Sequence, residues 1–190
     1  MRSSLNFNRH SQAQGQHAFL SPSKYQWINY DEDKLDRVFF ANQAARRGTE
    51  LHEFAHRAIR LREKLPATTR TLNQYVNDAI GYRMTPEQIL YVSENAFGTA
   101  DCIGFRNKTL RIHDLKTGVI EASVHQLEVY AAFFCLEYKF KPTDIGIELR
   151  IYQNDEVKVF EADPDAIFHI MDKTIVFDRR VRALRSEVPF

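Results

Sequence analysis

The sequence predicts an α/β protein in which helices flank a mixed β-sheet. Alternating apolar residues over 98–118, interrupted by a turn at 106–108, predict two antiparallel strands. Apolar residues at three- and four-residue spacing over 43–64 and 121–138 predict two helices. The second helix leads to another expected strand, 145–152, and a strand-helix-strand connection places its two strands parallel in one sheet. Antiparallel and parallel pairs together make the predicted sheet mixed.

Length and composition predict one domain. The chain has 190 residues, 44% of them hydrophobic, and a chain of this size can bury a core without disulfides or a structural metal. Residues 1–16 are polar and are expected to form a flexible arm, so the predicted domain spans 17–190. No apolar run approaches the ~18 residues that a membrane helix needs. Cys102 and Cys135 lack the spacing of a disulfide or zinc framework. We therefore expect a cytoplasmic protein without a membrane partner.

The remaining elements are predicted from helix caps and short apolar patterns. Ser21 is expected to cap a helix that begins at Pro22. We expect Trp27 in this helix to pack in the core rather than to stack on a base. The charged segment 31–37 predicts an exposed turn or linker. A short helix is expected at 72–80, strands at 88–94 and 156–160, and a terminal helix after Asp163 and Pro164 that carries the apolar residues Ile167, Ile170, Met171, Phe177, Val181 and Leu184.

Two carboxylates and an ammonium group are predicted to converge on the hairpin. Asp114 and Lys116 are two residues apart in one strand, so their side chains share a face, and Asp101 can reach that face from the neighbouring strand. Two nearby carboxylates repel each other unless a cation neutralises them, and oxygen ligands suit Mg²⁺ or Mn²⁺. A lysine beside them can orient a metal-bound water. The alternative is an ordinary hairpin with a solvated Asp-x-Lys pair.

A second pattern predicts a different metal. The segment His52-Glu53-Phe54-Ala55-His56 matches the His-Glu-x-x-His sequence of zinc proteases, in which two helical histidines bind zinc and the glutamate is the general base. A zinc metalloprotease is therefore the rival hypothesis, although no third ligand helix follows. His56 is otherwise expected at a solvated helix edge.

Four short motifs, in this order, resemble those of RecB-type nucleases of the PD-(D/E)xK superfamily. These are Ser21-Pro22-Ser23, then Gly48 to His52, then Gly98-Thr99-Ala100-Asp101 followed by Asp114-Leu115-Lys116, and finally Gln126 to Tyr130 in the pattern Gln-x-x-x-Tyr. The resemblance covers the chain from Leu20 to about Tyr138. It implies a restriction-endonuclease-like mixed β-sheet core flanked by helices, and an exonuclease of the stand-alone phage or bacterial form. Two cysteines cannot hold an iron-sulfur cluster, which needs four ligands.

The resemblance also implies residue roles. His52, Asp101 and Asp114 would bind one or two Mg²⁺ or Mn²⁺ ions together with the backbone carbonyl of Leu115. Lys116 would position or activate the attacking water. Gln126 and Tyr130 would brace the site or contact the DNA backbone beside the scissile phosphate.

The expected partner is DNA with a free or single-stranded end. A net charge of +1 gives no general attraction for nucleic acid, so contact requires a local basic patch. The candidates for that patch are Arg46, Arg47, Arg106, Lys108 and Arg111. Because no sequence-reading module is recognisable, we expect sequence-tolerant degradation from ends in recombination, repair or phage DNA metabolism. A recombination or single-strand-binding protein is a further expected partner. If a phage encodes the chain, the expected setting is its bacterial host cell. A catalytically silent fold that binds DNA or a protein is the third hypothesis.

Overall fold

The computed structural model describes residues 11–13 and 18–187. Contacts between Cα atoms divide the chain into two compact units, Met1–Arg46 and Arg47–Phe190, which we call the N-terminal unit and the sheet unit. Helix α1, Glu32–Leu61, contributes residues to both. Most of the predicted arm, 1–10 and 14–16, lies outside the described residues. The prediction of one domain over 17–190 stays a prediction.

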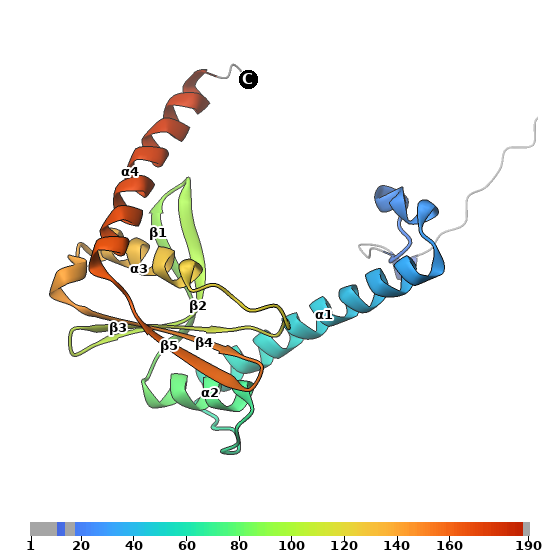
Figure 1. Cartoon of the computed structure of the whole chain (residues 1–190), viewed down its shortest axis with the longest axis horizontal. Helices are drawn as coiled ribbons and strands as arrows, with labels where there is room; N and C mark the ends of the chain where they lie inside the picture. Colours follow the sequence, from blue (N-terminus) through green and yellow to red (C-terminus); the bar gives the residue numbers. More distant parts are fainter. Residues whose placement is uncertain (1–10, 14–17, 188–190) are drawn as a thin grey trace, which may run out of the picture. The chain divides into compact units, whose positions relative to one another are not determined.

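The sheet unit contains one five-stranded sheet (Figure 1). Its strands are β1 (Thr85–Ser93), β2 (Ala96–Arg106), β3 (Thr109–Leu115), β4 (Gly146–Gln153) and β5 (Glu156–Glu161), in the spatial order β1-β2-β3-β4-β5. The β3–β4 pair is parallel and the other three pairs are antiparallel. This confirms the predicted mixed sheet, including the parallel strands on either side of the second long helix.

Helices cover both faces of this sheet. One core cluster joins Leu110 and Ile112 of β3 to α3 (His125–Tyr138) and to Ile167 of α4 (Pro164–Glu187). The other joins Leu115 and Tyr152 to α2 (Thr71–Gly81) and to the last part of α1. In Figure 1, α2 and α3 accordingly lie on opposite sides of β3, β4 and β5.

The hairpin between β2 and β3 forms as predicted, for a local reason. Asn107 and Lys108 both have positive φ, 50° and 58°. Two consecutive residues of this kind make the turn whose twist matches that of antiparallel strands. The turn pairs Arg106 with Thr109 and Cys102 with His113, so Asp101 and Asp114 follow next in the same register.

The N-terminal unit differs from the prediction at three points. The 3-10 helix η2 (Pro22–Asn29) begins at Pro22, but the Ser21 side chain does not cap it; the hydroxyl lies 2.8 Å from that of Ser23. Trp27 belongs to neither core cluster. The expected linker 31–37 is instead the start of α1, because Asp31 Oδ1 accepts a hydrogen bond from the Lys34 N–H at 2.7 Å and so caps the helix. The short η1 (Ser11–Ala13) precedes these elements.

The terminal helix α4 is longer than its buried face. Asp163 Oδ1 accepts a hydrogen bond from the Asp165 N–H at 3.0 Å, as a capping residue should. Of its residues only Ile167 is fully buried, whereas Phe177 is 61% exposed and Leu184 42% exposed. The predicted terminal helix therefore forms, but only its first half, with Ile167, Ile170 and Met171, packs apolar side chains against a core cluster.

The sequence predicts no membrane-spanning helix. Among the described residues, no helix combines the length and apolar character that crossing a bilayer requires.

Candidate functional site

His52 and Asp101 come together from a helix and a strand. The apolar stripe of α1 buries Ala55, Ala58 and Ile59 against the sheet, and this orientation turns His52 toward β2. His52 Nδ1 lies 3.4 Å from Asp101 Oδ2, and both side chains keep about a quarter of their surface exposed. Solvent and an ion can therefore reach this pair.

Asp114 and Lys116 share a face of the hairpin, as predicted. Lys116 Nζ lies 3.0 Å from Asp114 Oδ2, without the geometry of a hydrogen bond, so that buried oxygen has no hydrogen-bond partner. Burial, and then the negative charge of Asp101, raise the pKa of Asp114 to about 6, against the opposing effect of Lys116. A buried carboxylate with a raised pKa and a free oxygen is a group that a cation would stabilise.

The backbone connects these two pairs. Asp101 Oδ2 accepts a hydrogen bond from the Leu115 N–H at 3.2 Å, which ties the first carboxylate to the strand that carries Asp114 and Lys116. His52 also acts on Asp114 through its charge, in the direction that lowers the pKa of Asp114. The four predicted residues His52, Asp101, Asp114 and Lys116 thus form one electrostatically coupled group.

His56 lies closer to this group than the sequence predicted. It is 6% exposed, not solvated, and neither ring nitrogen has a hydrogen-bond partner. One ligand atom from each of His52, His56 and Asp101 lies within 4.8 Å of the others, so these three residues could hold a metal ion. Asp114 is not among the three, and its Oδ2 lies 3.0 Å from Lys116 Nζ.

Glu87 is the residue of this region that sequence reasoning missed. Its Oε1 lies 3.2 Å from His56 Nδ1, and its other oxygen pairs with Arg60. The φ of Glu87, 52°, is unusual for a non-glycine residue within a strand. It lies between the paired residues Pro86 and Gln88, opposite Asp101 in the register of β1 with β2. The sequence signal that could have found it is Pro86, which interrupts a strand pattern.

The Gln-x-x-x-Tyr residues extend from α3 to the hairpin. Gln126 Oε1 accepts a hydrogen bond from Lys116 Nζ at 2.9 Å. The Tyr130 hydroxyl donates to the Thr99 carbonyl at 2.6 Å, two residues before Asp101. Gln126 therefore orients the lysine, and Tyr130 anchors the strand that carries the first carboxylate.

Two glycines permit these close approaches. A Cβ on Gly98 would lie 3.1 Å from the Tyr130 ring, and one on Gly48 would lie 2.6 Å from Thr117 Oγ1. Both positions belong to the motifs noted in the sequence. Their role is steric, since neither contributes a reacting group.

The predicted DNA-binding residues separate into two groups. Arg46, Arg47, Arg106 and Lys108 are exposed. Arg111 is not free: its Nε lies 3.2 Å from Glu148 Oε1 and its guanidinium covers the Tyr82 ring at 4.6 Å. Arg111 is thus the weakest of the five candidates for contact with a phosphate.

The donor set fits a divalent ion. The ring nitrogens of buried His56 and Oδ2 of Asp114 have no hydrogen bond, although a charged side chain lies beside each residue, and His52 lies beside Asp101. A cation could satisfy these groups. Glu53, the base that the zinc-protease hypothesis needs, is exposed. Comparisons with protein-family models, curated proteins and solved structures found nothing that matches this chain. The function is therefore inferred from the geometry of the site.

Proposed function

We propose that this protein is a metal-dependent deoxyribonuclease of the RecB-type PD-(D/E)xK kind, with a restriction-endonuclease-like core. The observation that carries the proposal is the coupled group at the end of the hairpin. There a buried carboxylate, Asp114, lies between an ammonium group and a second carboxylate, with His52 beside them. Two acids of the same charge repel each other unless a cation neutralises them. A metal-dependent nuclease uses such a pair of carboxylates to hold its cation.

In this proposal His52, Asp101 and Asp114 hold Mg²⁺ or Mn²⁺, and the Leu115 carbonyl is a further ligand. The bound ion supplies Lewis acidity and a water of lowered pKa. Lys116, held by Gln126 at 2.9 Å, orients that water or neutralises charge on the phosphate. Tyr130 fixes the strand of Asp101 so that the carboxylates keep their separation.

The substrate of the proposed enzyme is DNA at an end or with a single-stranded end. Exposed Arg47, Arg106 and Lys108 offer cations for the backbone, and nothing in the described fold enters the major groove as a reading element. The proposed setting is the cytoplasm, that of a bacterial host cell for a phage protein. The proposed process is recombination, repair or phage DNA metabolism, alongside a recombination or single-strand-binding protein.

The decisive experiment removes the central carboxylate. Labelled linear DNA would be incubated with wild type and with Asp114→Asn, in Mg²⁺, in Mn²⁺ and in EDTA. We expect the variant to lose roughly a hundredfold or more of the activity and EDTA to abolish it. Asp172→Asn, on the exposed side of α4, is the matched control and should cleave like wild type. Wild-type rates in a pure Asp114→Asn preparation would refute the nuclease proposal.

A second experiment tests the mode of attack. Closed single- and double-stranded circles would be compared with the same DNA after linearisation. An exonuclease degrades only the linear forms. Circles cut as fast as linear DNA would refute exonuclease action and leave the metal site intact.

The His52–His56–Asp101 cluster supports a second candidate, a zinc hydrolase with Glu53 as base. This candidate predicts stoichiometric zinc and peptide cleavage that depends on Glu53. The nuclease proposal predicts that Glu53→Gln leaves DNA cleavage unchanged, because this side chain is exposed. Zinc content, peptidase activity and DNA cleavage of Glu53→Gln and His56→Ala would separate the two. A chain that binds DNA and cleaves nothing would be the catalytically silent fold.

A further inference from the structure

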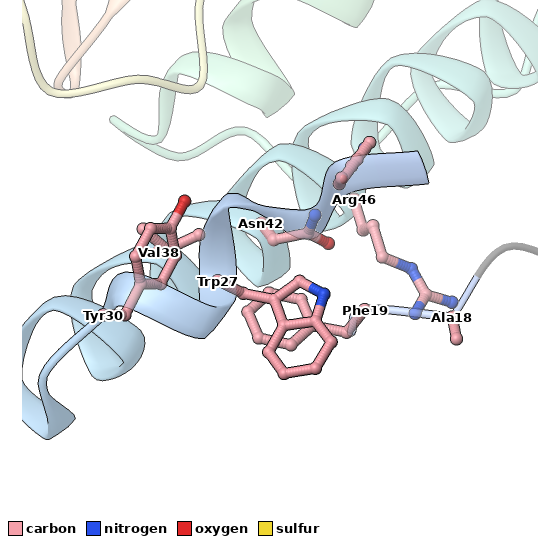
Figure 2. Close-up of a pocket in the computed structure, with 8 residues that line it drawn as sticks. Ala18, Phe19, Trp27, Tyr30, Val38, Asn42 and Arg46 are labelled. Carbon is pink, nitrogen blue, oxygen red and sulfur yellow. The ribbon is translucent and has the colours of Figure 1, made fainter. Parts of the chain in front are cut away.

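A cavity of about 550 Å³ lies within the N-terminal unit (Figure 2). Its wall contains three aromatic rings, two cationic side chains and one amide: Phe19, Trp27, Tyr30, Lys24, Arg46 and Asn42. In Figure 2 the indole of Trp27 lies at the centre, with Asn42 and Arg46 to one side and Tyr30 to the other. The volume is within the range of about 300–1,000 Å³ typical of small-molecule pockets.

The aromatic rings are held in place by neighbours. The Trp27 indole N–H donates to the Ser21 carbonyl at 3.0 Å. The Phe19 ring meets Phe39 edge-on with centroids 5.4 Å apart. Lys34 Nζ lies over the Tyr30 ring, 4.6 Å from its centroid. Trp27 is only half-buried, so the indole is positioned without being enclosed. A ring fixed at its edge and open on its face is suited to stacking.

The charge of the wall has one sign. Both Lys24 and Arg46 line the cavity, and no aspartate or glutamate is among the described residues of its wall. Neither cation forms an ion pair with another residue in the part of the chain that the structure describes. Arg111 of the sheet unit, by contrast, is paired with Glu148 and covers a tyrosine ring. The cations of the cavity are free to bind an anion.

Aromatic faces beside unpaired cations are the chemistry that recognises a nucleotide of a single strand. The base stacks on a ring, the phosphate contacts lysine and arginine, and an amide can bond to the edge of the base. A base pair in a duplex cannot enter, because its faces are covered by the neighbouring pairs. We propose that the cavity around Trp27 binds one nucleotide of single-stranded nucleic acid. The choice of ligand rests on the proposed function, but the site is distinct from the metal-binding group.

The chain provides its own reporter for this proposal. Trp27 is its single tryptophan, so fluorescence excited selectively at tryptophan comes from the cavity wall alone. Oligothymidylate, which lacks secondary structure, would be titrated into the full-length protein in EDTA, where the proposed nuclease cannot act. We expect saturable quenching that weakens as the salt concentration rises, because salt cations compete with Lys24 and Arg46 for the phosphates.

Variants separate specific binding from general attraction. Lys24→Ala combined with Arg46→Ala should weaken oligothymidylate binding roughly tenfold or more. Arg37 is an exposed arginine of the same unit that is not among the residues lining the cavity. Arg37→Ala should therefore change the affinity less than about twofold. With fluorescein-labelled oligothymidylate and anisotropy as readout, Trp27→Ala should also lose roughly tenfold. Trp27→Phe, which keeps a stacking face, should restore most of the affinity. Circular dichroism would verify that each variant keeps its helix content.

Three results would overturn the proposal. The first is unchanged affinity in the double variant. The second is equal quenching by heparin, a polyanion without bases, and the third is quenching by duplex DNA as strong as that by the single strand. These outcomes are independent of the catalytic proposal. Binding without any cleavage supports the cavity and refutes the nuclease, whereas cleavage without this binding refutes the cavity alone.

Discussion

The two units of this chain treat their apolar residues in opposite ways. In the sheet unit, both core clusters are assembled from side chains with almost no exposed surface, among them Tyr75 and Leu149. In the N-terminal unit, Tyr25, Ile28 and Phe40 are each 60–67% exposed, and no described residue belongs to either cluster. Since burial of apolar surface is the main stabilising contribution to folding, stability resides in the sheet unit. The aromatic residues of the N-terminal unit remain accessible for recognition.

The largest expected effect comes from a cavity in the sheet core. Leu149→Ala, at a fully buried position of β4, should lower the free energy of unfolding by about 2–5 kcal/mol. Phe40→Ala, at a position 67% exposed in the N-terminal unit, should change it by less than about 0.5 kcal/mol. Urea unfolding followed by far-UV circular dichroism measures both. Similar losses in the two variants would contradict the comparison.

A polar network of the sheet unit should show the next largest effect. Arg150 donates hydrogen bonds to Asp78 at 3.1 Å and to the Tyr82 hydroxyl at 2.9 Å, with its side chain only 15% exposed. Arg150→Met removes both hydrogen bonds, so that the Tyr82 hydroxyl loses this donor and Asp78 Oδ2 keeps the bond from the Tyr152 hydroxyl, and it should cost about 1–3 kcal/mol. Arg185→Met, which removes a cation 58% exposed beside Glu94, should cost less than about 1 kcal/mol in the same urea experiment. Equal costs would show that burial does not distinguish the two arginines.

The single tryptophan sharpens the comparison between the units. Trp27 fluorescence reports on the N-terminal unit, whereas far-UV circular dichroism reports largely on the helices and strands of the sheet unit. No described residue of the N-terminal unit belongs to either core cluster. We therefore expect the fluorescence transition at a lower urea concentration than the dichroism transition. Coincident transitions would mean that the two units unfold as one.

The smallest expected effect concerns the two cysteines, both in the sheet unit. Burial, and then the charge of Asp101, raise the pKa of the Cys102 thiol to about 12. Burial raises that of Cys135 to about 11. Both thiols therefore stay protonated near pH 8 and should react with Ellman's reagent far more slowly than free cysteine, until urea exposes them. Fast reaction of either thiol in the native protein would show that this part of the core opens readily.

The hairpin shows how much of the site local patterns can predict. Alternation in β3 determined that Asp114 and Lys116 share a face, and the turn at 106–108 brought Asp101 alongside. The Gln126–Lys116 hydrogen bond was not predicted, because only the family resemblance assigned Gln126 to the site. The relations within the hairpin depend on neighbours in sequence or on one strand register, and single-sequence reasoning handles both.

The failures have a common physical cause. Burial of His56 and its contact with Glu87 require β1 to lie beside a helix that ends more than twenty residues earlier, and no periodicity encodes that distance. The exposed second half of α4 illustrates the same limit, because apolar residues such as Phe177 and Leu184 do not show from sequence whether another element covers them. Segment 31–37 was misread because charged residues at a helix start look like a linker until a cap is seen.

The bare backbone at Gly98 limits which sequences this site can use. The Tyr130 ring lies against that backbone so closely that even a methyl group would have to displace it by a few tenths of an ångström. That ring carries the hydroxyl that holds Thr99, two residues from Asp101. In a randomised library selected for function, position 98 should therefore accept almost nothing but glycine, although it has no chemistry of its own. Its neighbour Phe97, 59% exposed, should vary freely.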